Sequence, residues 1–104
     1  MGKKDKIHEI TALLSKSLRH KIGSIVNKED IYASKYARDA DVLMKEARKI
    51  AISENWNAYD KSKIKFELSK KLKNELQKKE FLDDKKFGLM DKEIGYALKV
   101  LELD

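Results

Sequence analysis

The chain contains no cysteine and no proline, and only four of its 104 residues are glycine. Without cysteine there is no disulfide bridge, no thiolate nucleophile and no cysteine-ligated zinc or iron–sulfur site. Without proline the commonest helix breaker is missing, and with so few glycines the turn residues of a sheet protein are scarce. These absences favour a helical fold and exclude several classes of metal and redox protein.

Long apolar runs are missing as well. No segment approaches the 18 or so consecutive apolar residues that a membrane-spanning helix needs. The first residues, MGKKDKIHEITALL, contain lysines but lack the apolar core of a signal peptide. We therefore expect no membrane span and a cytoplasmic protein. Hydrophobic residues make up 41% of the chain and charged residues 40%, a balance that allows one domain with a modest core.

Apolar residues recur at intervals of three and four along most of the chain, which is the spacing of amphipathic helices. The pattern predicts an all-α fold, a small bundle of three long helices and one short C-terminal helix within a single domain, residues 1–104. The expected helices span about 5–26, 28–52, 60–82 and 91–102.

Capping and turn residues set these boundaries. Asp5, Asn27 and Asp91 can each accept a hydrogen bond from a free N–H group at a helix start. Residues 83–88 have the composition of a charged loop, with Gly88 as its turn residue. The second helix has a broad, alanine-rich apolar face, so we expect it to be the central helix of the bundle.

The third expected helix carries the net charge of the chain. Residues 61–79 hold eight lysines and two glutamates, a net charge of +6, and the whole chain is also +6. Isoleucine and leucine repeat every four residues along one side of this helix, at Ile64 and onward, while Lys63, Lys70 and Lys73 point the opposite way.

Two aromatic residues, Trp56 and Tyr59, fall in the polar break before this helix. They fit two interpretations: an aromatic plug that packs at a helical corner, or a platform on which nucleic-acid bases stack. Buried packing is the commoner role of aromatic side chains, so the plug is the preferred interpretation.

Catalytic and metal-binding motifs are incomplete. His8 and Glu9 begin like the zinc-binding H-E-x-x-H motif, but Ala12 stands where the second histidine is required. His20 lacks the further ligands that a zinc site needs. No glycine-rich phosphate loop or nucleophile motif occurs. We expect no enzyme activity, no metal site and no cofactor, and the sequence indicates no particular small-molecule ligand.

Two functions fit the remaining features. The first is an interaction module that acts as a subunit, adaptor or structural oligomer through its apolar helix faces, with a protein partner or a second copy of itself. The expected interface is a seam on the second helix: Tyr32, Tyr36, Ala40, Leu43, Ala47 and Ile50.

The alternative is a protein that binds the backbone of RNA or DNA without sequence specificity, using lysines to neutralise phosphates. Only three of the 24 basic residues are arginine, and arginine is the residue suited to bidentate contacts with bases. The expected binding residues are Lys63, Lys70, Lys71, Lys73, Lys78, Lys16, Arg19 and Lys21.

Overall fold

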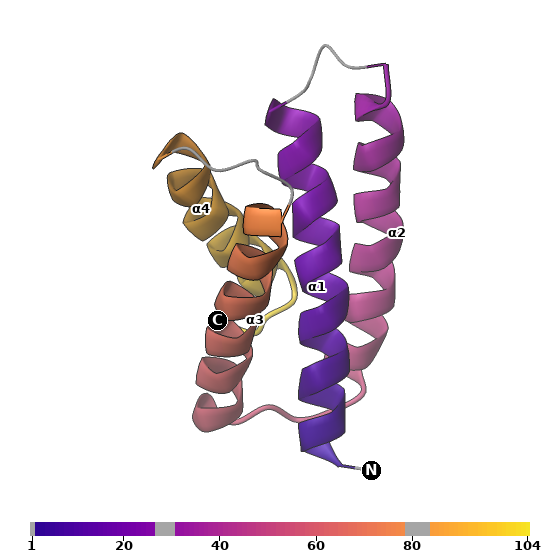
Figure 1. Ribbon diagram of the computed structural model, residues 1–104. Helices are drawn as coiled ribbons and strands as arrows, with labels where there is room; N and C mark the ends of the chain where they lie inside the picture. Colours follow the sequence, from indigo (N-terminus) through magenta and orange to yellow (C-terminus); the bar gives the residue numbers. More distant parts are fainter. Residues whose placement is uncertain (1, 27–30, 79–83) are drawn as a thin grey trace.

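The computed structural model describes residues 2–26, 31–78 and 84–104, with the backbone alone for 84–87. It confirms the predicted all-α bundle of three long helices and one shorter C-terminal helix (Figure 1). The helices are α1 (Lys3–Val26), α2 (Ala33–Ile52), α3 (Ala58–Lys78) and α4 (Asp84–Val100). Among the described residues, none of these helices is both long and apolar enough to cross a membrane.

The helix at the centre of the bundle is α1. It packs against α2 on one side and against α3 and α4 on the other, and α3 and α4 also contact each other (Figure 1). In the described parts of the chain, α2 approaches no helix except α1. The prediction that the helix at 28–52 would be central is therefore wrong.

The physical reason lies in the hydroxyl groups of α1. Thr11, Ser15 and Ser17 are all buried. The hydroxyls of Thr11 and Ser15 donate to carbonyl oxygens one turn earlier in α1, at 2.8 and 2.9 Å. Ser17 Oγ donates to the carbonyl oxygen of Ala40 on α2, at 2.7 Å. Because every one of these hydroxyls has an acceptor, each can be buried at little cost, and α1 buries a wider arc than its aliphatic residues indicate.

The hydrophobic core lies where α1, α3 and α4 meet, and α2 adds small side chains to it. Fully burying a leucine or isoleucine contributes about 1.5–3 kcal/mol, so the repeats on α1 and α3 supply most of the stabilisation. The buried core residues of α3 are Ile64, Leu68, Leu72 and Leu76. Those of the other helices include Ile10, Leu14, Leu18, Ile22, Ala47, Ala51, Ile94 and Leu98.

The fourth helix is longer than predicted. It begins at Asp84, seven residues before the expected cap at Asp91, and Gly88 lies within the helix and not in a loop. A glycine inside a helix costs only about 0.5–1 kcal/mol, and the burial of Met90 and Ile94 on the same helix outweighs that cost.

The other boundaries differ by a few residues: Asp5 lies within the first turn of α1 and not before it, and α2 begins at Ala33, five residues after its expected start. The first helix begins at Lys3 and ends at Val26, and the second ends at Ile52. The expected cap of the second helix, Asn27, and the expected end of the third, near residue 82, lie outside the described residues.

At its C-terminal end α4 is closed by a hydrogen-bonded turn. Glu102 N donates to Lys99 O at 3.1 Å, and Leu103 N donates to Leu98 O at 2.7 Å. This pair of bonds is the Schellman motif, in which the residue after the helix has a left-handed backbone. Here that residue is Glu102, with φ of 58°, where glycine is usual. The turn places Leu103 in the core, only 1% exposed.

Replacing Glu102 with glycine is expected to raise the free energy of unfolding by about 0.5–1 kcal/mol. A left-handed backbone costs an L-residue about 1–2 kcal/mol, and glycine relieves this cost. The greater conformational freedom of glycine in the unfolded chain reduces the resulting stabilisation by about 0.4–1 kcal/mol. Denaturant unfolding measures the difference. Glu102→Ala keeps the Cβ atom and is the matched control, which should stay within about 0.5 kcal/mol of the wild type. A less stable Glu102→Gly variant would contradict the strain assigned to this residue.

Candidate functional site

Opposite its buried residues, α3 presents a row of lysines and two aromatic rings. At about 100° per residue, Tyr59, Lys63, Phe66, Lys70 and Lys73 lie on one arc of the helix. Tyr59 is 73% exposed and Phe66 is 66% exposed. Lys70 and Lys73 are exposed, and Lys63 is half-exposed. We call these five residues the α3 outer face.

The acidic residues of α3 lie on other sides of the helix. Asp60 is buried, and its Oδ2 atom accepts a hydrogen bond from Lys3 Nζ of α1 at 2.9 Å. Glu75 Oε2 lies 2.8 Å from Arg19 Nη1, also of α1. Glu67 is half-buried and borders a small groove between α1 and α3. Within residues 58–78, every charged side chain on the arc of the α3 outer face is therefore a lysine.

Two further lysines lie on the side of α3 that faces α4. Lys61 and Lys65 lie on the α4 side of α3 and line an open groove of about 450 Å³. Gly95 and Leu98 of α4 form the other wall of this groove. Asp104 lines the same groove, so these two lysines lie beside a carboxylate and apart from the α3 outer face.

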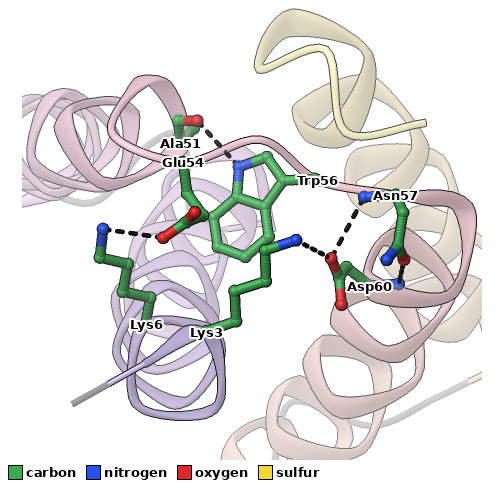
Figure 2. Close-up of polar contacts among 7 residues, drawn as sticks. All are labelled: Lys3, Lys6, Ala51, Glu54, Trp56, Asn57 and Asp60. Atoms are coloured by element: carbon green, nitrogen blue, oxygen red, sulfur yellow. Dashed lines mark hydrogen bonds and ion pairs between the residues drawn. The ribbon is translucent and has the colours of Figure 1, made fainter.

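The first turn of α3 is held in place by a reciprocal cap (Figure 2). Asp60 N donates to Asn57 Oδ1 at 2.8 Å, and Asn57 N donates to Asp60 Oδ2 at 3.1 Å. This arrangement satisfies two N–H groups that a helix start otherwise leaves free. Because Lys3 Nζ bonds the same Oδ2 atom, the cap also ties the start of α3 to α1. The direction in which the α3 outer face points is fixed at this corner.

Trp56 fills the same corner. Its indole N–H donates to Ala51 O at 2.8 Å (Figure 2). Its half-buried ring packs against the core. Beside it, Lys6 Nζ lies 3.1 Å from Glu54 Oε2. The interpretation as an aromatic plug is right for Trp56 and wrong for Tyr59, which is exposed. Tyr59 precedes the buried Asp60 by one position, and that step of about 100° turns it outward.

One lysine predicted to bind phosphate, Lys71, is directed into the bundle. Its Nζ donates to Thr11 Oγ1 at 2.6 Å and to His8 O at 3.2 Å, so it links α3 to α1. Burial lowers the pKa of Lys71, because a partly buried ammonium group loses hydration. This lysine therefore lies apart from the α3 outer face.

Two basic residues of α1 are also engaged within the bundle. Arg19 pairs with Glu75, and Lys21 Nζ lies 2.6 Å from Glu93 Oε2 on α4. The Glu93 side chain is only 10% exposed, so the ammonium group of Lys21 compensates a nearly buried carboxylate. The remaining predicted residues, Lys16 on α1 and Lys78 at the end of α3, are exposed but lie outside the arc of the α3 outer face.

Phe66 is the member of the α3 outer face that the sequence reasoning missed. Its position in the sequence predicts exposure, because it lies about 200° around the helix from both Ile64 and Leu68, which are buried. It also lies one turn after Lys63 and one turn before Lys70. A phenylalanine midway between two lysines, opposite the apolar stripe, is placed in solvent by the helical period alone.

Of the six residues in the predicted seam on α2, two are buried against α1 and four keep exposed surface. Ala40 and Ala47 are buried against α1, where the small side chain lets the two helices approach closely. The other four residues keep exposed surface along one side of α2, and we call them the α2 flank. They are Tyr32, which is 54% exposed, and the half-buried Tyr36, Leu43 and Ile50.

Comparison of the chain with protein-family models gave no match, and comparison with curated proteins and with solved structures gave none either. In the described ranges, no three histidine, aspartate or glutamate side chains are placed to hold a metal ion. Two surfaces nevertheless have a defined chemistry. The α3 outer face is basic and aromatic, and the α2 flank is apolar.

The capped corner predicts a decline of stability in acid. Bonds from Lys3 and from the Asn57 N–H lower the pKa of Asp60, and the bond from Lys6 lowers that of Glu54. A carboxyl group whose pKa is lower in the folded protein stabilises it above the unfolded pKa, and this stabilisation is lost as the pH falls through the folded pKa. We therefore expect the free energy of unfolding to decline below about pH 5.

Asp60→Asn tests this expectation. The variant should be less stable than the wild type at about pH 7 and should lose less stability between about pH 7 and pH 3. Lys3→Met should show the same flattening, because it removes the other half of the ion pair. Denaturant unfolding at the two pH values gives the comparison. Equal losses in the wild type and both variants would show that this ion pair does not shape the pH dependence.

Proposed function

We propose that this protein is a small basic interaction module that binds the phosphate backbone of nucleic acids through the α3 outer face, without reading base sequence. The observation that carries this proposal is the separation of charge on α3. Lys63, Lys70 and Lys73 point outward, while Asp60 and Glu75 are paired with basic residues of α1. Clustered lysines on a rigid rod can neutralise phosphates and release their counterions.

The dimensions of the lysine row suit a nucleic-acid backbone. Lys63 and Lys73 are ten residues apart, so they span about 15 Å along the helix axis. That length is about four times the 3.4 Å rise per phosphate of one strand along the axis of B-form DNA. Three lysines over this span can contact separate phosphates at the same time.

Arginine usage supports backbone binding over base recognition. The planar guanidinium group of arginine is the side chain that reads guanine by two parallel hydrogen bonds. None of the three arginines lies on α3, and Arg19 is held by Glu75. Lysine ammonium groups act as point charges on flexible stems, which favours contact with phosphates of any sequence.

Charge reversal at Lys63, Lys70 and Lys73, each to glutamate, is expected to remove binding. For the wild type, three phosphate contacts give an affinity that falls about 20- to 40-fold between about 50 and 200 mM salt. Fluorescence anisotropy with a labelled mixed-sequence oligonucleotide of about 20 nucleotides measures both quantities, because the salt slope reports the number of contacts.

The matched control reverses Lys35, Lys45 and Lys49, three lysines of α2. Each triple variant lowers the net charge from +6 to 0, so a difference between them reports the place of the charge and not its amount. The α2 variant should keep most of the wild-type affinity. Absence of wild-type binding at low salt, or equal losses in the two variants, would overturn the proposal.

A second candidate function is self-association through the α2 flank. It is favoured by the observation that, of the described helices, α2 packs against α1 alone. Tyr36, Leu43 and Ile50 recur every seven residues along this flank, which is the repeat of a helical seam. Pairing of α2 with α2 of a second copy about a two-fold axis would cover both flanks.

Light scattering over a range of protein concentrations tests self-association. We expect a dimer that Leu43→Lys converts to a monomer, because the lysine places a charge in the seam. Val42→Lys is the matched control, since Val42 is 59% exposed and lies about 100° away around α2. A wild-type monomer at every concentration, or equal effects of the two substitutions, would contradict this function and leave the proposal for α3 untouched.

A further inference from the structure

Two large aromatic rings on the α3 outer face are open to solvent. Tyr59 and Phe66 are seven residues apart, so they lie on the same side of the helix and about 10.5 Å apart along its axis. Both side chains are more than half exposed. Lys63 and Lys70 stand one turn before and one turn after Phe66. The strip thus alternates ring and ammonium group along a straight helix.

This alternation differs from an ordinary protein-binding patch. A docking surface for another protein is usually a contiguous apolar patch, and here about 10.5 Å of helix separates the two rings, with the charged Lys63 between them. Single exposed apolar residues are common on protein surfaces. Two aligned rings interleaved with lysines are the arrangement of a stacking platform beside a track for phosphates.

We infer that the nucleic acid bound by the α3 outer face is single-stranded, with bases stacked on Phe66 and Tyr59 and phosphates against Lys63 and Lys70. This inference rests on the proposed nucleic-acid function. In a duplex the base faces are covered by neighbouring base pairs, so a surface ring cannot reach them. An unpaired strand can turn its bases out onto aromatic side chains.

Stacking has no preference for one base, because every base presents an aromatic face. The inferred platform is therefore consistent with binding that does not depend on sequence. Loss of one base–ring stack lowers affinity about five- to 150-fold. Trp56 does not belong to this platform, since its indole N–H is bonded to Ala51 O and its ring is half-buried at the helical corner.

The experiment distinguishes the contribution of base stacking on Phe66 from that of phosphate binding by the lysines. The probes are a labelled single strand of about 20 nucleotides, as RNA and as DNA, and a DNA duplex of the same sequence. At matched salt we expect either single strand to bind at least about fivefold more tightly than the duplex. Phe66→Ala should lower single-strand affinity about five- to 150-fold, with the salt slope and the duplex affinity unchanged. Phe66→Trp should retain single-strand binding, because the ring is kept.

Two further variants complete the test. Lys70→Gln should weaken single-strand and duplex binding together and reduce the single-strand salt slope by about 0.7, the value of one phosphate contact. Tyr96→Ala removes a ring that is 59% exposed on α4 and should change neither affinity. This variant controls for loss of an exposed aromatic side chain elsewhere.

The outcomes distinguish this inference from the function on which it rests. Should no probe bind at low salt, the nucleic-acid function fails and the inference fails with it. Should single strands and duplex bind equally, with Phe66→Ala altering neither, backbone binding stands and the inference of a single-stranded ligand is overturned.

Discussion

Hydroxyl groups of α1 donate to backbone carbonyl oxygens, and the arrangement of the bundle depends on these bonds. A buried hydroxyl without a partner costs about 1–3 kcal/mol, so unsatisfied groups at Thr11, Ser15 and Ser17 would restrict the surface that α1 can bury. With their acceptors in place, α1 contacts all three other helices. It thereby holds α2 and α3 on opposite sides of itself (Figure 1).

The ion pairs between α1 and α3 matter more for the distribution of charge than for stability. Partly exposed pairs such as Lys3–Asp60 and Arg19–Glu75 contribute about 0–1 kcal/mol each. Their larger effect is that carboxylates of α3 are neutralised on the side that faces α1. Among residues 58–78, the lysines of the α3 outer face therefore share their arc of the helix with no carboxylate.

Periodicity in the sequence was sufficient for the fold class and for the buried face of α3, because a repeat of four places successive leucines on one side whatever the neighbours are. Ser17 shows why the central helix was assigned wrongly: its acceptor, Ala40 O, lies on another helix, and no local pattern reveals that. The same holds for Lys71 and Arg19, whose partners are about 60 residues away in the chain. Phe66, in contrast, could have been placed in solvent from helical angles alone.

The two proposed surfaces reinforce each other. Pairing of two copies through the α2 flank leaves both α3 outer faces accessible, since α2 and α3 lie on opposite sides of α1 (Figure 1). A dimer built this way would carry one lysine row at each end, and a strand long enough to reach both would form the second contact at the effective concentration of a linked site. Each copy adds its own phosphate contacts, so the salt dependence of a dimer would be steeper than that of one face. Self-association in this arrangement would therefore increase affinity for a long strand without any new contact on α3.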